Sequence, residues 1–415
     1  MVEKNTDENF IERFKKISRE TPVVDTHNDF PYLLRVQLHN EFETESRFNF
    51  DDKLQSHTDL MKFRQGKIGL QFFSCFIECK DDDYLYQDFN KANSAVRDTM
   101  EQIDVVTRLV DSYLDDMKMV LTSLQVMDVY SGGKVAITMG VEGLHQVDSS
   151  LSVLRKYYEL GVRYITLTHN CDNPFATAAS SVVAGLPDKG LSDFGRSCIQ
   201  EMNRIGMMVD LSHVSYKTML DVLEITKAPV MFSHSSAYSI TPNERNVRDD
   251  VLLKMKENGG VICINFFPLF ISQTGDECAT IDDAVDHIKH VVELIGWEHV
   301  GLGSDFDGIP EGPKGLEDVS KYPDLLIKVM EKLNASDSEI QLLMGKNVLR
   351  VWNDNERVSR LLQKAGTQAV NANWPERDWS FYDYAKTFPE IFPGAYQAKK
   401  NTYKDSQSLD LTTKK

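Results

Sequence analysis

A chain of 415 residues is long enough to bury the core of one large barrel or of two smaller domains. Its 41% hydrophobic and 26% charged residues are ordinary for a soluble globular protein. The formal net charge of −17 argues against a nucleic-acid partner, because binding phosphates in bulk requires a surplus of cations. A small anionic ligand would therefore need a local cationic anchor.

Short apolar runs rich in β-branched and aromatic residues recur along the chain and predict eight strands. Their near-continuous hydrophobicity, as in VAITMGV or VICINFF, is typical of parallel strands that are covered on both faces. In chain order the predicted strands are Val23–His27, Leu70–Ile77, Lys134–Gly143, Val162–His169, Met207–His213, Pro229–Ser236, Val261–Phe267 and His299–Asp307.

Amphipathic segments that predict helices separate these runs. The longest connection, residues 78–133, contains a long helical stretch around Ala92–Tyr113 and a second short helix. Eight strand–helix alternations predict an α/β protein with a (β/α)8 barrel rather than an open doubly wound sheet. No G-x-G-x-x-G motif supports a dinucleotide-binding fold. Other helical segments are SVLRKYYELG, GRSCIQEMNRIG, KTMLDVLEIT, DVLLKMKENGG and IDDAVDHIKHVVELIG, several of which end in Gly, a helix stop signal.

Both ends of the chain are polar. We expect residues 1–20 to form a helical, polar extension, residues 21–365 the catalytic barrel, and residues 366–415 a tail that packs on the barrel and has a disordered end. The first twenty residues lack the apolar segment of a signal peptide, and the last eighteen lack the hydrophobic tail of a lipid-anchor signal. The longest apolar run, Val261–Ile271, is shorter than the ~20 residues that span a bilayer. The expectation is a cytoplasmic protein without a membrane segment.

Polar residues fall at the carboxyl ends of the predicted strands, which is where barrels of this type hold their chemistry. A single histidine there is more often structural than a ligand, but four at equivalent positions beside carboxylates predict a metal site. These strand-end residues are His27 and Asp29 (VVDTHND), Glu142 (GVEG), His169 (ITLTHN), His213 (VDLSH), His234 (MFSHSS), and Asp305 and Asp307 (GSDFDG).

The kinds of side chain at these strand ends limit the choice of metal. Imidazoles and carboxylates without a thiolate suit zinc, manganese or iron, and they leave room for water on the metal. Two pairs of ligands with one carboxylate between them have the composition of a two-metal site, in which the ions lie ~3.5–4 Å apart and a hydroxide bridges them. His27 and Asp29 are two residues apart and so point to the same side, and Glu142 is the expected bridging carboxylate.

Taken as a set, DTHND, GVEG, TLTHN, DLSH, FSHSSA followed by ERNV, and GSDFDG resemble the membrane (renal-type) dipeptidase family of zinc peptidases. The similarity runs from about Thr21 to Trp352, with the motifs in the family's order. The set is specific, although no single motif is. The resemblance implies an enzyme that hydrolyses dipeptides with broad side-chain specificity, accepts a D-residue in the second position and forms a homodimer.

The resemblance also implies which residues hold two zinc ions per chain. His27 and Asp29 match the ligands of one zinc, and His213 and His234 match those of the other. Glu142 matches the carboxylate that bridges the two ions beside the attacking hydroxide.

Three further residues match positions that handle the substrate. His169 matches a histidine that contacts the substrate and steadies the tetrahedral intermediate. Arg245, in ERNV, matches the arginine whose planar fork holds the substrate's C-terminal carboxylate. Asp305 matches the group that takes and returns the proton. Position alone leaves Asp307 as an equal candidate for the base, and the match favours Asp305, with a turn role for Asp307.

The sequence departs from the family's pattern at a few positions. Phe267 stands where many relatives have a Tyr that hydrogen-bonds the substrate, and Tyr32 replaces a common Trp near the expected pocket for the N-terminal side chain. Cys79 and Cys171 match a pair that forms a disulfide in secreted relatives, whereas a second pair has no counterpart.

Two other classes of function stay open at this point. One is an amidohydrolase-type barrel that acts on another amide or on a cyclic amide such as a β-lactam or hydantoin. The other is a binding protein that has kept the barrel and lost catalysis. Arg245 argues for a substrate with a free carboxylate, and the presence of every expected ligand and of Asp305 argues for an enzyme.

Overall fold

The computed structural model describes residues 2–46, 48–51, 54–79, 94–273 and 278–376. Its centre is a sheet of parallel strands in the order β1-β2-β4-β5-β6-β7-β8-β9. A parallel bridge pairs Asn28 with Phe306, and the N–H of Asp305 donates to the carbonyl of His27 at 3.2 Å, so the end of the sheet returns to its beginning. The predicted (β/α)8 barrel is confirmed. The strands on this path are β1 (Val23–Asn28), β2 (Ile68–Cys75), β4 (Val135–Glu142), β5 (Val162–Thr166), β6 (Met208–Asp210), β7 (Met231–Phe232), β8 (Val261–Ile264) and β9 (Val300–Leu302).

All eight predicted strands are present, but several are shorter than predicted. β6, with three residues, and β7, with two, end before their histidines, because the chain leaves the ladder there and turns into loops. The sequence did not predict a ninth strand, β3 (Met117–Met119). It pairs with the first three residues of β4, ahead of the part of β4 that pairs with β5. Three residues are too few for a periodic pattern to reveal a strand.

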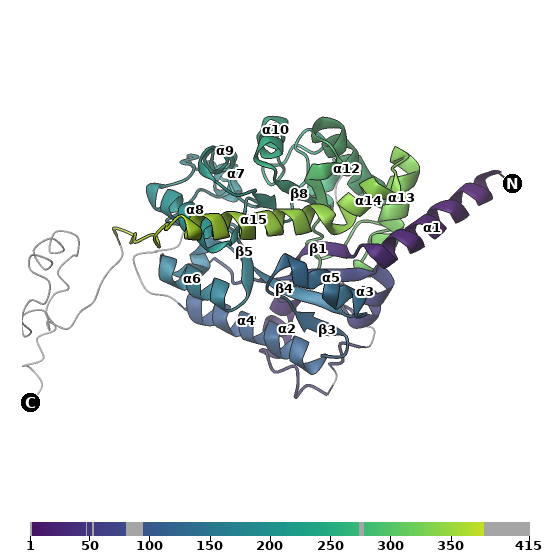
Figure 1. The fold of residues 1–415 in the computed structure, drawn as a ribbon, viewed down its shortest axis with the longest axis horizontal. Coiled ribbons are helices and arrows are strands. Elements are labelled where there is room, and N and C mark those ends of the chain that lie inside the picture. Colours follow the sequence, from purple (N-terminus) through teal and green to yellow (C-terminus); the bar gives the residue numbers. More distant parts are fainter. Residues whose placement is uncertain (1, 47, 52–53, 80–93, 274–277, 377–415) are drawn as a thin grey trace, which may run out of the picture.

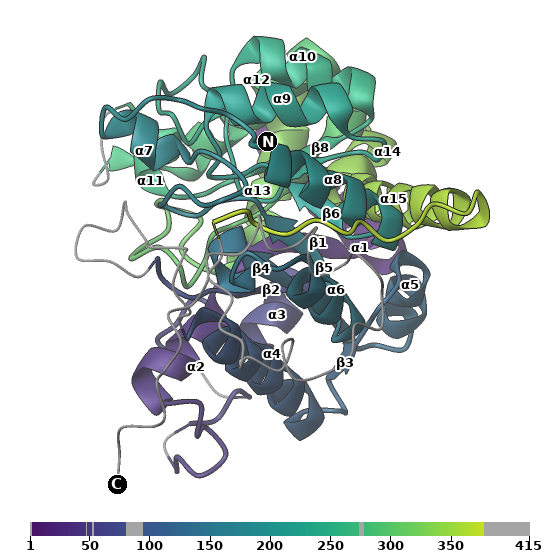
Figure 2. The same ribbon diagram turned by 90° about the vertical axis from the view of Figure 1, so that its left-hand side faces the viewer.

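Helices alternate with the strands and surround them. In both views, α4 and α6 lie on one side of the barrel and α9, α10 and α12 on the opposite side (Figure 1 and Figure 2). The five amphipathic segments became α6, α8, α9, α10 and α12, and glycines with positive φ end α8 and α10 at residues 206 and 259. The barrel helices up to the last strand are α2 (Phe30–Leu38), α3 (Leu60–Gly66), α4 (Ala95–Ser112), α5 (Ser123–Ser131), α6 (Leu151–Glu159), α7 (Ala179–Val183), α8 (Asp193–Ile205), α9 (Tyr216–Ile225), α10 (Asp249–Asn258), α11 (Pro268–Ile271) and α12 (Ile281–Ile295).

The predicted helices of the long connection are α4 and α5, and the start of the first prediction, Ala92, lies outside the described residues. The remaining elements flank the barrel or connect its parts. They are α1 (Val2–Glu20), α13 (Tyr322–Leu333), α14 (Asp337–Gln341), α15 (Asn347–Lys364), and four short 3-10 or π segments at Leu144–Val147, Trp297–His299, Val319–Lys321 and Leu342–Lys346.

Two apolar cores hold the barrel together. The larger lies mainly between strands and helices. The smaller fills the barrel near the starts of the strands, where Leu70 and Phe72 of β2 meet Trp352 of α15, and the rings of Phe72 and Trp352 are 5.6 Å apart. Trp352 is fully buried, and truncating a core Trp to Ala costs ~3–5 kcal/mol. This packing seals the amino-terminal end of the barrel and leaves the carboxyl ends of the strands for the site.

The segments outside the barrel pack against it where the structure describes them. In α1, Phe14 and Ile17 are buried. In the tail, the N–H of Val370 donates to Glu201 at 3.0 Å and the ring of Trp374 lies 6.0 Å from that of Phe194. The disorder predicted for the end of the tail falls on residues 377–415, outside the described residues. Among those described, no helix is both long and apolar enough to cross a membrane.

Candidate metal centre

A cavity of about 690 Å³ lies at the carboxyl ends of the strands. Most of the predicted site residues line it, and the remaining two, His27 and His234, are fully buried and approach Glu142 from within the barrel. The fold thus brings all nine residues singled out in the sequence to one place. Those on the cavity wall are Asp29, Glu142, His169, His213, Arg245, Asp305 and Asp307.

Glu142, the last residue of β4, lies at the centre of the group. Its Oε1 is 2.9 Å from Nε2 of His213, 3.4 Å from Nε2 of His234, 3.6 Å from Nε2 of His27 and 4.0 Å from Nε2 of His169. These four histidines come from four different strand ends. Glu142 therefore lies close both to His27 and to the pair His213 and His234, as a carboxylate that bridges two metal ions must.

Asp29 completes the group on the side of His27. Its Oδ2 lies 3.2 Å from Nε2 of His27, and His27, Asp29 and Asp305 together have the spacing of possible metal ligands. Asp29 stands at the N-cap of α2 without capping the helix through its side chain, so its carboxylate remains available to the site. A Cβ at Gly308 would lie 2.3 Å from Oδ2 of Asp29, so the last residue of GSDFDG must be glycine to leave this carboxylate in place.

Several ligand atoms in the group form no hydrogen bond with any residue that the structure describes, and this tests whether the residues fit a metal. Nε2 of His27 and Oδ1 of Asp29 are buried without a hydrogen bond. Nε2 of His213 faces Nε2 of His234 at 3.0 Å, and two imidazole lone pairs at this distance repel unless a proton or a metal ion lies between them. Nitrogen and oxygen donors without sulfur suit zinc. The residues therefore fit a metal centre.

Burial sets the charge of the imidazoles. It lowers the pKa of His169, His213 and His234 well below the ordinary value, so these rings are neutral and have a lone pair to offer. Burial also acts to lower the pKa of His27, but the carboxylates of Asp29 and Glu142 outweigh it and raise that pKa to about 10. A proton on His27 thus balances the carboxylates in the metal-free protein, and a bound cation would replace it.

The backbone is strained at three of these positions. His213, Asp305 and Asp307 have φ angles of 63°, 65° and 65°, in the left-handed region. For a residue with a Cβ this costs ~1–2 kcal/mol, and such strain is held where the surrounding structure over-determines it, often at functional sites. The turns that follow the strands orient these side chains, and the sequence did not predict the turns.

The two aspartates of GSDFDG have different surroundings. Nδ2 of Asn265, just after β8, donates to Oδ2 of Asp305 at 2.9 Å, and burial raises the pKa of Asp305. Asp307 is instead tied to the loop before α3, because its Oδ1 accepts the N–H of His57 at 2.7 Å while its own N–H donates to Nδ1 of His57 at 2.9 Å. Of the two, Asp305 belongs to the cluster around His27.

Arg245 is the cationic group of the cavity. Its side chain is buried, yet Nη1 and Nη2 have no hydrogen-bond partner among the residues that the structure describes. The guanidinium lies 5.2 Å from the ring centre of Phe270, whose neighbour in the cavity wall is Phe267. Burial lowers the pKa of Arg245, but a guanidinium remains protonated at neutral pH. A buried, unpaired cation of this kind is poised to accept an anion.

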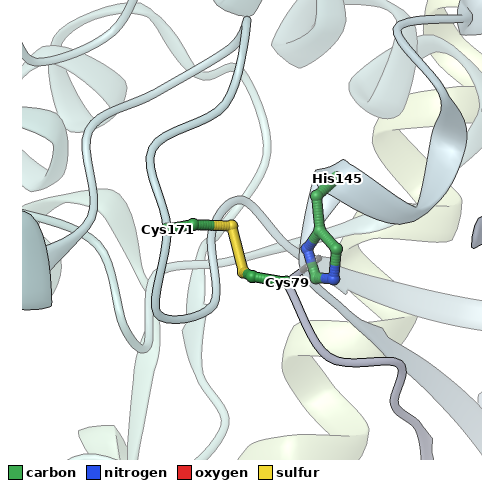
Figure 3. A group of neighbouring side chains, drawn as sticks. All are labelled: Cys79, His145 and Cys171. Atoms are coloured by element: carbon green, nitrogen blue, oxygen red, sulfur yellow. A yellow bond between two sulfur atoms is a disulfide. The ribbon is translucent and has the colours of Figure 1, made fainter. Parts of the chain in front are cut away.

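His169 lies beside the metal ligands and is held by a disulfide two residues further on. Its ring centre is 4.5 Å from that of Phe76 and 4.5 Å from that of His213. Cys79 and Cys171 are bonded to each other, which confirms their expected proximity and fixes the loop after β5 to the segment after β2 (Figure 3).

His145 lies next to this disulfide and points toward it (Figure 3). Its Nε2 donates to the carbonyl of Ile77 at 2.6 Å. The three residues have the spacing of metal ligands, but both sulfurs are taken up by their mutual bond. The arrangement therefore supports the wall of the cavity rather than a metal.

Several functional positions were missed by the sequence analysis. These side chains hydrogen-bond a ligand, Asp305 or Ser233, and all of them except Asn170 are buried in or beside a strand. Asp25 and Asp210 left a signal, because each is a carboxylate within an apolar strand, two or three residues before a ligand histidine. The missed residues are Asp25, Tyr164, Asn170, Asp210, Ser233 and Asn265.

A parallel barrel with imidazoles and carboxylates converging at its strand ends, beside a cavity, has the architecture of a metal-dependent hydrolase. The chain belongs to the membrane dipeptidase family, peptidase family M19, which it matches over residues 11–366. The predicted family is confirmed, and with it the class of enzyme, a metallopeptidase of the dipeptidase type.

Individual relatives agree with this assignment. Two proteins of Schizosaccharomyces pombe, each described as an uncharacterized dipeptidase, are similar to the chain. One is 61% identical over 403 residues, 96% of either chain, and the other is 46% identical over 339 residues, 81% of either chain. A metallo peptidase from Rhodobacter sphaeroides, liganded with a phosphinate mimic of the dipeptide L-Ala-D-Ala, shares the fold with a TM-score of 0.71 at 23% identity, covering 81% of this chain and 99% of its own.

Proposed function

We propose that the protein hydrolyses dipeptides with broad side-chain specificity, using two zinc ions per chain, and accepts a D-residue in the second position. The observation that carries this is the unpaired, buried guanidinium of Arg245 in the same cavity as the histidine and carboxylate cluster. A metal cluster alone would attack many amides. A fixed cation beside it selects substrates that carry a carboxylate close to the scissile bond.

The proposed ligands are His27 and Asp29 for one zinc and His213 and His234 for the other, with Glu142 between them. When bound, zinc supplies Lewis-acid polarisation of the peptide carbonyl and activation of water at neutral pH. The neutral state of His213 and His234, which follows from burial, leaves their lone pairs available without loss of a proton.

Asp305 is the proposed proton carrier. Burial raises its pKa, and Asn265 holds its Oδ2 at 2.9 Å, so the carboxylate is oriented and can bind a proton near neutral pH. In this role it takes a proton from the attacking water and returns it to the leaving amine. His169, which lines the cavity and whose Nε2 lies 4.0 Å from Oε1 of Glu142, is proposed to donate to the developing oxyanion.

Arg245 is proposed to hold the C-terminal carboxylate of the substrate in a bidentate pair. The ring of Phe270 lies against it and the ring of Phe267 packs on Phe270, so the C-terminal side chain would meet an aromatic wall. Tyr32 and Phe76, whose ring centres are 5.1 Å apart, line the cavity elsewhere and would meet the N-terminal side chain. The L-Ala-D-Ala mimic bound by the Rhodobacter sphaeroides peptidase supports the proposed tolerance for a D-residue.

A panel assay tests this proposal. Zinc-loaded protein is offered dipeptides with L- and D-residues in the second position, their C-terminal amides, tripeptides, N-acylated amino acids, a β-lactam and a hydantoin. Hydrolysis confined to dipeptides is the expected result. Preference for a cyclic amide or an N-acylated amino acid would instead identify a different amidohydrolase.

Homodimer formation and a cytoplasmic location are also proposed. Light scattering of the purified protein tests the first. For the second, structural disulfides persist in oxidising compartments and are rare in the cytosol, so the redox state of Cys79 and Cys171 in the native cell, together with fractionation, is the relevant measurement.

A further inference from the structure

A fully buried carboxylate lies below the metal centre at the end of β6. Oδ1 of Asp210 accepts the backbone N–H groups of Ser212 at 3.1 Å and of Ser233 at 2.8 Å. Its Oδ2 accepts the hydroxyl groups of Thr166 at 2.5 Å and of Ser233 at 2.6 Å. Both oxygens of Asp210 therefore act as acceptors, and the hydroxyl proton of Ser233 points toward Asp210.

The orientation of the Ser233 hydroxyl determines how Ser233 can bond the next residue, His234. Its Oγ lies 2.8 Å from Nδ1 of His234. A hydroxyl has one proton, and the 2.6 Å bond to the carboxylate of Asp210 uses it, because a carboxylate oxygen only accepts. Oγ of Ser233 must therefore accept a proton from Nδ1 of His234. Nε2 of His234 then keeps a lone pair and faces Glu142 at 3.4 Å.

We propose that Asp210 and Ser233 are positioning residues that fix His234 as the tautomer protonated at Nδ1, so that Nε2 is ready to bind a metal. The proposal rests on the proposed metal centre and goes beyond it, because it concerns the direction of a hydrogen-bond chain inside the barrel. A neutral imidazole exists in two tautomers, and only the one with a bare Nε2 can bind a metal from this side.

The other ligand histidines have partners at the same atom. Oδ1 of Asn170 lies 3.2 Å from Nδ1 of His213, and the hydroxyl of Tyr164 lies 2.9 Å from Nδ1 of His27. An amide oxygen only accepts, so His213 is likewise protonated at Nδ1. The hydrogen-bond chain from His234 through Ser233 differs because it ends in the carboxylate of Asp210. One substitution can therefore reverse the direction of its hydrogen bonds.

Asp210→Asn is that substitution. An asparagine can keep Oδ1 for the two backbone N–H groups and place its NH2 group where Oδ2 was, next to two hydroxyl groups that can accept. Ser233 would then accept from residue 210 and donate to Nδ1 of His234, which moves the ring proton to Nε2. Shape is preserved and only the hydrogen-bond direction changes. We expect the affinity for one of the two zinc ions to fall by at least ~10-fold.

A double variant separates direction from shape. Ser233→Ala removes the hydroxyl that transmits the reversal, so Asp210→Asn combined with Ser233→Ala should bind zinc more tightly than Asp210→Asn alone. Ser235→Ala is the matched control: this serine directly follows His234, is also buried, and its hydroxyl bonds Oγ of Ser212 at 3.1 Å. It should bind zinc like the wild type.

Two measurements decide the outcome. Chelator competition gives the affinity and stoichiometry of zinc for each variant, and 15N spectra of histidine-labelled, metal-free protein give the tautomer of His234. Protonation at Nδ1 in the wild type and at Nε2 in Asp210→Asn, with weaker zinc binding that the double variant relieves, is expected. A folded Asp210→Asn protein with wild-type zinc affinity or an unchanged tautomer would overturn the proposal, as would a double variant as weak as the single one.

If Asp210→Asn does not fold, the zinc affinities of Ser233→Ala and Ser235→Ala are compared instead. Weaker zinc binding in Ser233→Ala alone supports the chain, and equal binding in both refutes it. Failure of the proposed function gives a different result, namely wild-type protein that binds zinc with the expected tautomer but does not hydrolyse dipeptides.

Discussion

Replacing Arg245 by alanine removes the cation that is proposed to bind the C-terminal carboxylate of the substrate and so to select dipeptides by length. The guanidinium is buried and both Nη atoms lack hydrogen-bond partners in the described part of the chain, so substrate is the group expected to pair with it. The variant should hydrolyse dipeptides slowly and should no longer distinguish a dipeptide from its C-terminal amide. Zinc content should not change, because Arg245 is not among the clustered ligands.

The size of the effect follows from burial. Removing one partner of a buried, charge-assisted pair costs ~2–5 kcal/mol. At ~1.36 kcal/mol per factor of ten, even the lower figure reduces kcat/KM by ~30-fold. The stability of the free protein should change little, because the substitution removes a desolvated, unpaired charge together with a contact to Phe270 that is worth ~0.5–2 kcal/mol.

Arg163 provides the matched control. It is as buried as Arg245, but its guanidinium donates to the carbonyls of Leu121, Tyr158 and Val162, away from the cavity. Arg163→Ala should lower the melting temperature and leave the preference for dipeptides over amides intact, the reverse of Arg245→Ala. Steady-state kinetics on both substrates and thermal melts of both variants test this. Wild-type enzyme that cleaves dipeptide amides as readily as dipeptides would refute the carboxylate anchor.

Further predictions concern the metals, the disulfide and one glycine. Chelation should abolish activity, and about two equivalents of zinc should restore it; activity that survives complete metal removal would contradict the metal centre. Glu142→Gln should lower both zinc content and activity, since a neutral amide bridges two cations poorly. Denatured protein from a secretory host should show four free thiols without reductant and six with it, because Cys79 and Cys171 are bonded and the other four cysteines are free. Gly308→Ala should weaken zinc binding, because its Cβ would lie 2.3 Å from Oδ2 of Asp29.

The barrel could be predicted because each of its strands is covered on both faces. That burial makes β4 mostly apolar and β8 wholly so, and the change to a polar residue marks where each strand ends. Parallel strands bring those ends together, so the sequence alone was enough to place His27 and Glu142, which are far apart in the chain, in one site. The motifs around them then pointed to the family.

What the sequence did not disclose depends on contacts across the barrel. Ser233 binds Asp210, 23 positions earlier, and Asn265 binds Asp305, 40 positions later. Nothing local marks such pairs, because a serine or an asparagine after a strand has many ordinary roles. The left-handed turn at His213 is also hidden, since the residue that adopts it is not a glycine. Arg245 was placed only through the family resemblance, because its loop carries no periodic pattern.

The helix that seals the amino-terminal end of the barrel, α15, is also the last helix of the barrel to leave the ribosome. Val348, Val351 and Trp352 cover apolar side chains of strands made hundreds of residues earlier, among them Val24 and Leu70. During synthesis, that apolar surface therefore stays uncovered until nearly the whole chain has been made. Transiently exposed apolar surface promotes aggregation in proteins of this size. Production of the enzyme in the cell should thus depend on chaperones that shield the unfinished barrel, and on an intact carboxyl-terminal helix.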